Sequence, residues 1–243
     1  MIGRLSTWFQ RQRERSAAEL APLALLALIA ALLASFARLA GSITSGNTYA
    51  FDERLLRALR NPADLADPIG PFWLEHVMRD ITSLGSFTVI VVMTVVTIGY
   101  LLIDRKRAAA VFVLAAITGG VALSEALKAL FARPRPDLVA HLVDVNSLSF
   151  PSGHAMLSAV TFLTLGAVLS RLQSRRSLKI YVIAIAMVLT LLVGSSRVYL
   201  GVHWPTDVLA GWCAGASWAI GCWLVERWLQ RRGQIEPPSG PSG

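Results

Sequence analysis

The chain has 243 residues, 54% of them hydrophobic, and a mean hydropathy of +0.56. This apolar content excludes an ordinary soluble domain and indicates a polytopic membrane protein. The formal net charge is +8, from 23 Lys and Arg against 15 Asp and Glu. Because the basic residues are spread over short stretches between apolar segments, we attribute this charge to membrane topology and expect no nucleic-acid partner.

In chain order, six segments are apolar over about the 17–25 residues that a helix needs to cross a bilayer, although the fourth is slightly short. They are residues 20–37, 81–103, 108–124, 155–170, 180–196 and 208–225. Lipid-exposed backbone must satisfy its hydrogen bonds internally, so each segment is expected to be helical. We predict an all-α, polytopic membrane bundle of six transmembrane helices in one domain, residues 20–230.

The ends of the chain show no catalytic pattern. Residues 1–19 form a basic, partly amphipathic lead-in, and the first apolar run exceeds the core of a signal peptide, so a retained span is expected. The tail, residues 231–243, has no apolar face and is expected to be disordered. Cys213 and Cys222 have neither metal-binding nor redox spacing and are expected to be core residues.

The connection between the first two spans contains a candidate amphipathic helix. Phe51, Leu55, Leu56 and Leu59 fall on one helical face, whereas the charged residues of this stretch fall elsewhere. This pattern predicts a helix that lies on the membrane surface. Two interpretations remain open: a structural cap on the bundle, or a lid over a binding site.

The distribution of basic residues predicts the orientation. If the chain crosses the membrane six times, fourteen of the 23 Lys and Arg residues lie on one side: in the N-terminal stretch, at 105–107, at 171–179 and after the last span. Cytoplasmic loops are enriched in Lys and Arg, so both termini are predicted to be cytoplasmic. Three polar clusters then lie together on the outer side.

The first polar cluster follows the third apolar segment. Lys128 lies seven residues before Arg135, and Pro134 and Pro136 predict that the helix does not continue far past Lys128. The prolines stiffen the backbone, which suits holding a guanidinium still. Taken alone, these cations are equally consistent with a lysine that reaches the interface and arginines that meet lipid headgroups.

The second cluster, Pro151-Ser152-Gly153-His154, stands immediately before the fourth segment. Ser152 is a candidate N-cap, and the free amides around Gly153 at a helix N-terminus favour an anion. His154 is one residue further in and can donate a proton. By itself, the tetrapeptide is also consistent with a capping motif that carries an incidental histidine.

The third cluster joins the fifth and sixth segments. Arg197 precedes His203, and Asp207 follows that histidine by four residues, with Pro205 at a place where a helix can begin. A carboxylate that accepts from one ring nitrogen exposes the other as a nucleophile. A structural histidine–aspartate bond is the alternative. The three clusters share one side of the membrane and complement each other chemically, which favours one phosphate-handling site.

In this order, the clusters resemble the three-part signature of the type 2 phosphatidic acid phosphatase (PAP2) superfamily, which also includes vanadium haloperoxidases. The matching positions extend from Lys128 to Asp207, within a core of about residues 108–226. The resemblance implies a hydrolase of phosphomonoester or pyrophosphate headgroups on membrane lipids. It also implies a phosphohistidine intermediate and no metal or other cofactor.

The resemblance further implies a role for each matching residue. His203 attacks phosphorus, Asp207 orients it, and His154 protonates the leaving oxygen. The phosphate oxygens are held by three cations and by the residues at the start of the fourth helix: Lys128, Arg135, Arg197, Ser152 and Gly153. Arginine forks match phosphate geometry, and three cations can replace a metal ion. One histidine must be neutral and the other protonated, so a bell-shaped pH–rate profile is predicted.

The expected substrates are undecaprenyl pyrophosphate or a phosphatidate-type lipid such as phosphatidylglycerol phosphate, in a bacterial cytoplasmic membrane with the site facing outward. A haloperoxidase-like anion pocket is one alternative, which the six spans disfavour because that branch is typically soluble. A non-catalytic lipid binder or transporter is another. The paired acid and nucleophile argue against a non-catalytic protein. The substrate lipid and the bilayer are the partners that the sequence indicates.

Overall fold

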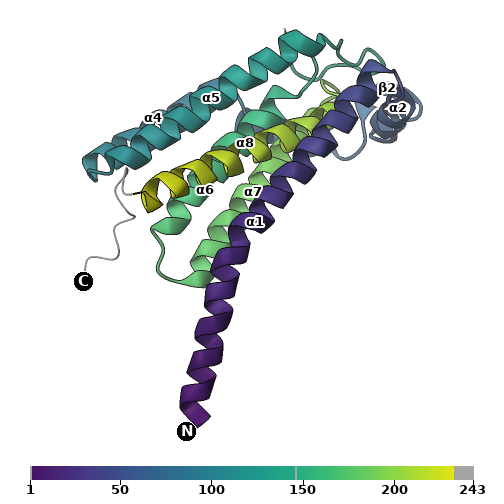
Figure 1. Cartoon of the computed structure of the whole chain (residues 1–243). Helices are drawn as coiled ribbons and strands as arrows, with labels where there is room; N and C mark the ends of the chain where they lie inside the picture. Colours follow the sequence, from purple (N-terminus) through teal and green to yellow (C-terminus); the bar gives the residue numbers. More distant parts are fainter. Residues whose placement is uncertain (1, 146, 233–243) are drawn as a thin grey trace.

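The computed structural model describes residues 2–145 and 147–232, with side chains from residue 20 onward. Within these residues there are eight α-helices and one two-stranded antiparallel hairpin: α1 Ile2–Thr44, α2 Tyr49–Ala58, β1 Arg60–Asn61, β2 Asp64–Pro68, α3 Phe72–Ser83, α4 Phe87–Ile103, α5 Arg107–Phe131, α6 Gly153–Arg171, α7 Arg176–Tyr199 and α8 Pro205–Arg231. The long helices form a bundle (Figure 1), which confirms the predicted all-α class. The lead-in continues into α1 as one helix, and residues 233–243 of the expected disordered tail lie outside the described residues.

Within the described residues, five helices are individually long and apolar enough to cross a membrane: α1 from Leu20, α5, α6, α7 and α8. The helices α3 and α4 pass the same test only as a pair, bent by 49°. Counting that pair as one span gives the predicted six, but the expected uninterrupted segment 81–103 is broken. Ser86 caps α4 by accepting from the Val89 amide at 3.3 Å, so α4 begins anew after the turn.

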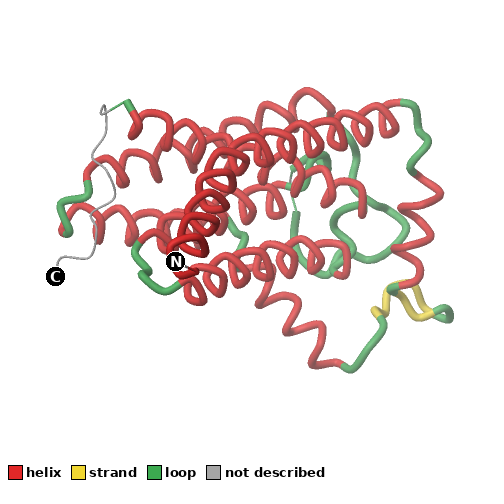
Figure 2. The backbone as a smooth tube through the Cα atoms, turned by 60° about the horizontal axis from the view of Figure 1, so that its bottom comes forward, coloured by secondary structure: helices red, strands yellow, loops and turns green. Residues whose placement is uncertain are grey.

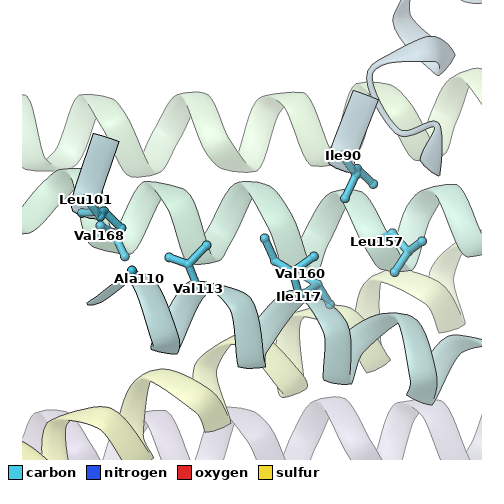
Figure 3. Packing of buried hydrophobic residues seen from close by; sticks show 8 residues of the cluster. All are labelled: Ile90, Leu101, Ala110, Val113, Ile117, Leu157, Val160 and Val168. Carbon is cyan, nitrogen blue, oxygen red and sulfur yellow. The ribbon is translucent and has the colours of Figure 1, made fainter. Parts of the chain in front are cut away.

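Helix α6 lies at the centre of the bundle, where it packs against α4, α5, α7 and α8. Figure 3 shows an apolar cluster that joins α4, α5 and α6 through buried aliphatic side chains: Ile90, Leu101, Ala110, Val113, Ile117, Leu157, Val160 and Val168. In a bilayer, such interlocking supplies much of the helix association, because lipid tails are as apolar as these side chains.

Two glycines let α8 approach α6 closely. A Cβ on Gly215 would lie 2.5 Å from the Met156 carbonyl oxygen, and one on Gly211 would lie 2.8 Å from the Ser152 carbonyl oxygen. Small residues four apart are a common basis for close packing of membrane helices. This contact fixes the start of α6 against the start of α8, where the second and third polar clusters lie.

The two ends of the bundle differ. The α4–α5 and α6–α7 connections and the end of α8 lie at one end, and α2 with the β-hairpin lies at the other (Figures 1 and 2). The predicted basic connections therefore share one end, opposite α2.

The predicted surface helix is present as α2, and its buried face includes a charged residue. Phe51 and Leu55 are 53% and 41% exposed, whereas Asp52 and Leu56 are both 0% exposed. The four apolar residues therefore do not share one environment, because Leu56 packs inside whereas Phe51 and Leu55 point outward. Asp52 is drawn inward by an ion pair with Arg133, and this turns Phe51 and Leu55 outward.

Candidate active site

The first and second clusters meet where α5 ends and α6 begins. Helix α5 stops at Phe131, and Ala132 follows in a left-handed conformation with φ of 45°, so the chain turns away as the prolines predicted. The Lys128 ammonium points at the start of α6, because a Cβ on Gly153 would lie 3.0 Å from its Nζ. Lys128 also pairs with the exposed Glu125 carboxylate at 3.2 Å.

Arg135 links the first cluster to the third. Its Nε donates to the Ser147 carbonyl oxygen at 2.7 Å, and its Nη1 donates to the Val202 carbonyl oxygen at 2.5 Å. The same Nη1 lies 3.2 Å from Nε2 of His203. Burial lowers the pKa of Arg135, and the Asp207 carboxylate opposes this effect. The guanidinium remains charged at neutral pH because its ordinary pKa is above 12.

His203 is 1% exposed, and its contacts define its tautomer. A guanidinium only donates hydrogen bonds, so the Nε2 atom that faces Arg135 must be the acceptor and Nδ1 must carry the proton. Nδ1 lies 3.4 Å from Ser149 Oγ and 3.5 Å from Asp207 Oδ2. Burial, followed by the charges of Arg135, Arg197 and Lys128, holds the pKa of His203 well below its usual 6.5. The imidazole is therefore neutral at physiological pH, with its Nε2 lone pair facing the cations.

Asp207 is fully buried, and hydrogen-bond donors surround its carboxylate. Helix α8 begins at Pro205, as predicted, and Asp207 Oδ2 accepts from the Trp204 amide at 3.0 Å and from the Ser149 hydroxyl. Its Oδ1 accepts from Arg133 Nη1 at 2.6 Å. Asp207 thus lies near His203 but makes no direct hydrogen bond with it, and Ser149 Oγ bridges the two side chains.

The second cluster adopts the predicted cap. Helix α6 begins at Gly153, and the Ser152 hydroxyl accepts from the Ala155 amide at 3.5 Å. The Ser152 amide donates to the Asp207 carbonyl oxygen at 3.0 Å, which ties this cap to α8. His154 is partly exposed, and the positive charges of Arg197, Lys128 and Arg135 lie near its imidazole.

Arg197 completes the cluster of cations. Its guanidinium is 3% exposed and donates from Nη1 to Thr82 Oγ1 of α3 at 3.1 Å. Among the described residues, its Nε has no hydrogen-bond partner. A buried cation with a free donor is a place where an anion is stabilised. Within residues 2–145 and 147–232, no group of three or more His, Cys, Asp or Glu side chains is placed to hold a metal ion.

Several residues that support the site are absent from the set expected from the sequence: Asp52, Thr82, Arg133, Ser149 and Thr206. Arg133 and Ser149 lie within three residues of the expected motifs, so their proximity could have indicated them. Asp52 and Thr82 come from α2 and α3, more than forty residues before the first motif. Only the packing of these helices on the site reveals them.

Comparisons with known proteins agree with this geometry. The sequence profile of the PAP2 superfamily matches residues 109–231. The chain is 34% identical over 186 residues to phosphatidylglycerophosphatase B of Bacillus subtilis (strain 168), covering 74% of this chain and 85% of that protein. It is 34% identical over 128 residues to an undecaprenyl-diphosphatase of Sulfolobus acidocaldarius, covering 51% of this chain and 57% of that protein.

A solved structure shares the fold. The crystal structure of a transmembrane PAP2 type phosphatidylglycerolphosphate phosphatase from Bacillus subtilis superposes with a TM-score of 0.76 at 32% identity, covering 84% of this chain and 98% of that one. The resemblance expected from the three motifs is confirmed, and the chain belongs to the PAP2 superfamily.

Proposed function

We propose that this PAP2 membrane phosphatase hydrolyses a lipid phosphomonoester or pyrophosphate through a phosphohistidine on His203. The observation that carries the proposal is the environment of His203. Its neutral imidazole presents Nε2 to Arg135, and Nδ1 faces Ser149 and Asp207. This combines an available lone pair on one nitrogen with a carboxylate that stabilises the positive ring as a bond forms on the other.

The reaction has two displacements at phosphorus. His203 Nε2 forms an N–P bond while the bond between phosphorus and the leaving oxygen breaks, and His154 gives that oxygen its proton. Water then attacks phosphorus, His154 accepts a proton from it, and the N–P bond breaks to release inorganic phosphate. The same residue acts as acid and then as base, so the protons balance over the cycle.

The cations hold the phosphoryl oxygens during both steps. Phosphoryl transfer depends on positioning and charge neutralisation, which the Arg135 and Arg197 guanidiniums and the Lys128 ammonium provide. Ser152 and the Gly153 amide add donors at the N-terminus of α6, where the helix dipole favours an anion. The exposed Glu125 is the partner that a bound phosphate would replace on Lys128.

The substrate class follows from a membrane-embedded scaffold with the site at one end of the bundle. A lipid can keep its tail in the bilayer while its phosphate enters from the interface. Relatives of this chain include a phosphatidylglycerophosphatase and an undecaprenyl-diphosphatase, which supports these two headgroups as candidates. The distribution of Lys and Arg supports a site on the outer face of the cytoplasmic membrane, and an outward-facing site favours undecaprenyl pyrophosphate.

The test is phosphate release by the detergent-purified protein in EDTA. Undecaprenyl pyrophosphate, phosphatidate and phosphatidylglycerol phosphate are offered separately, with His203→Ala as control. We expect release that survives EDTA and is lost in the variant, and the order of rates identifies the headgroup. Release that EDTA abolishes, or that His203→Ala retains, would contradict the proposed mechanism. Lipid binding without release from any substrate would favour the non-catalytic alternative.

A further inference from the structure

A buried ion network extends from the nucleophile to α2. Arg133 is 3% exposed and lies between two fully buried carboxylates. Its Nη1 donates to Asp207 Oδ1 at 2.6 Å, and its Nη2 donates to Asp52 Oδ2 at 2.8 Å. Asp52 also accepts from the Thr206 amide at 3.0 Å and from the Thr206 hydroxyl at 2.7 Å. One residue of α2 thus reaches both Arg133 and the first turn of α8.

The two carboxylate oxygens of Asp207 have different partners. Oδ1 is taken by Arg133, whereas Oδ2 accepts from Ser149 and Trp204 and faces Nδ1 of His203. Arg133 therefore lies on the far side of the carboxylate from the imidazole. It differs in this from Arg135, which contacts His203 directly.

Arg133 is held rigidly and stays charged. The rings of Tyr49 and Trp204 lie 5.5 Å and 5.4 Å from its guanidinium carbon, at distances typical of cation–π contacts. Burial opposes its charge, but the carboxylates of Asp207 and Asp52 outweigh burial and raise the pKa of Arg133. A planar fork with two carboxylate partners fixes the Asp207 carboxylate more firmly than a lysine would.

We propose that Asp52 and Arg133 are positioning residues for the nucleophile, and that α2 must be docked on the bundle for His203 to react. The inference rests on the role proposed above for His203. Asp52 fixes Arg133, Arg133 fixes Asp207, and Asp207 holds the imidazole for attack. With two carboxylates and one guanidinium, the network keeps one net negative charge behind the imidazole. That charge stabilises the positive ring as the N–P bond forms.

If the network had only a structural role, different results would be expected. A buried ion pair is weak evidence for a contribution to stability, and breaking it leaves an unpaired charge. If the network only fastened α2, its loss would lower the melting temperature but leave the pH dependence of the remaining activity unchanged. A positioning role requires that the pKa of His203, and therefore the acid limb of kcat/KM, responds to each charge in the network.

The two halves of the network should move the acid limb in opposite directions. Asp52→Asn removes a negative charge near His203, so its imidazolium is stabilised less and the acid limb moves to lower pH. Arg133→Met removes a positive charge, so the limb moves to higher pH. Both variants should lower kcat by about 10- to 100-fold, the loss expected from small misplacements of reacting groups, with KM nearly unchanged.

The experiment measures kcat, KM and the pH profile of the full-length protein in detergent at a temperature well below melting. Glu53→Gln is the matched control, because it makes the same charge change on α2 outside the network. Arg133→Lys keeps the positive charge that Arg133→Met removes, but lacks the planar guanidinium. Its acid limb should therefore lie closer to that of the original protein. A profile and kcat of Asp52→Asn equal to those of Glu53→Gln would overturn the inference, even if Arg133→Met does not fold.

His203→Ala, run alongside, separates the two claims. If it is inactive and Asp52→Asn behaves like the control, only the positioning role is wrong. If His203→Ala retains turnover, the proposed mechanism fails, and the positioning role fails with it.

Discussion

The surroundings of His203 fix both its tautomer and its charge. Arg135 faces Nε2 and can only donate, so the proton must be on Nδ1, toward Ser149 and Asp207. Burial and three nearby cations oppose a second proton. The cations that we propose to bind phosphate thus also keep Nε2 of His203 unprotonated.

This environment predicts the pH dependence of the free enzyme. Protonation of His203 should abolish attack, but its pKa is held well below 6.5, so the acid limb of kcat/KM should lie well below pH 6.5. The measurement is kcat/KM from pH 4 to 9, with the exposed His76→Gln as control. An acid limb centred near pH 6.5 in both proteins would contradict the assignment.

The same pKa shift has a consequence for stability. The unfolded chain binds a proton at this histidine below about pH 6.5, whereas the folded chain does not. The unfolded state therefore gains protons first as the pH falls, and the free energy of unfolding should decrease below about pH 6.5. Thermal melts of His203→Gln and the original chain at pH 7.5 and 5.5 test this, because the variant should lose less stability on acidification.

Thr82 is the acceptor that holds Arg197. Thr82→Val keeps the shape but removes the hydroxyl that accepts from Nη1. A charge-assisted hydrogen bond contributes about 1.5–3 kcal/mol, so kcat/KM should fall about tenfold or more. Thr118→Val, the same change at an exposed position on α5, is the control and should be neutral. Equal kinetics for the two variants would show that Arg197 does not depend on α3.

The contact between α6 and α8 determines the separation of the two histidines. His154 is in the first turn of α6, and His203 directly precedes α8. Between these helices, Gly211 and Gly215 face the Ser152 and Met156 carbonyl oxygens at distances that leave no room for a Cβ. The two histidines, which we propose to be the acid and the nucleophile, are therefore positioned by backbone contact as well as by hydrogen bonds.

Gly215→Ala should damage this contact. A Cβ at this position meets a backbone oxygen, which cannot rotate away, and such overpacking costs about 1–3 kcal/mol. Gly221→Ala on the same helix meets nothing within 4 Å and should be neutral or stabilising, since Ala is the better helix former. Thermal melting in detergent, with kcat for each variant, provides the comparison. A Gly215→Ala protein as stable and active as Gly221→Ala would contradict this account.

The sequence predicted the helices and motifs whose signals are local. Six apolar windows correspond to the spans, and the cap at Ser152 and the helix start at Pro205 lie where their residue types indicated. The break in the second span was not predicted, because the window from 81 to 103 carries no charge, and the small and polar residues at its start, Thr82, Ser83, Gly85 and Ser86, are also compatible with one span. Gly85 in this turn lies close against the Val193 side chain of α7, a contact that hydropathy does not encode.

The orientation of α2 shows the same limit. Its apolar pattern predicted a helix, but an ion pair with a residue 81 positions away decides which face is buried. The helical pattern predicts that Asp52 is exposed to solvent. Its burial could be recognised only from the position of Arg133 in the folded chain. The choice between a cap and a lid becomes, in our proposal, a third role: a docked helix that positions the nucleophile.

For the protein as a whole, the two ends of the bundle have different chemistry. The basic connections lie at one end and α2 lies at the other (Figure 1). Asp52 of α2 contacts Arg133, which pairs with Asp207 of the candidate site. In a bacterial cytoplasmic membrane, the basic end is expected to face the cytoplasm and the site to face outward.

Cysteine labelling tests this orientation. Replacing Cys213 and Cys222 by Ala gives a background into which Asp144→Cys or Ser174→Cys is introduced, both at exposed loop positions at opposite ends of the bundle. A membrane-impermeant maleimide should label the Asp144→Cys protein in intact cells and the Ser174→Cys protein only after permeabilisation. The reverse pattern would place the site on the cytoplasmic side.

The central claim is the covalent intermediate on His203, and trapping it is the most direct test. The purified protein is mixed with a lipid substrate carrying labelled terminal phosphate, quenched in alkali within milliseconds, and digested for mass spectrometry. We predict label on the peptide that contains His203, absent from His203→Ala and from heat-denatured protein. Phosphate release in a burst-free reaction with no labelled peptide, or label on another side chain, would contradict the mechanism.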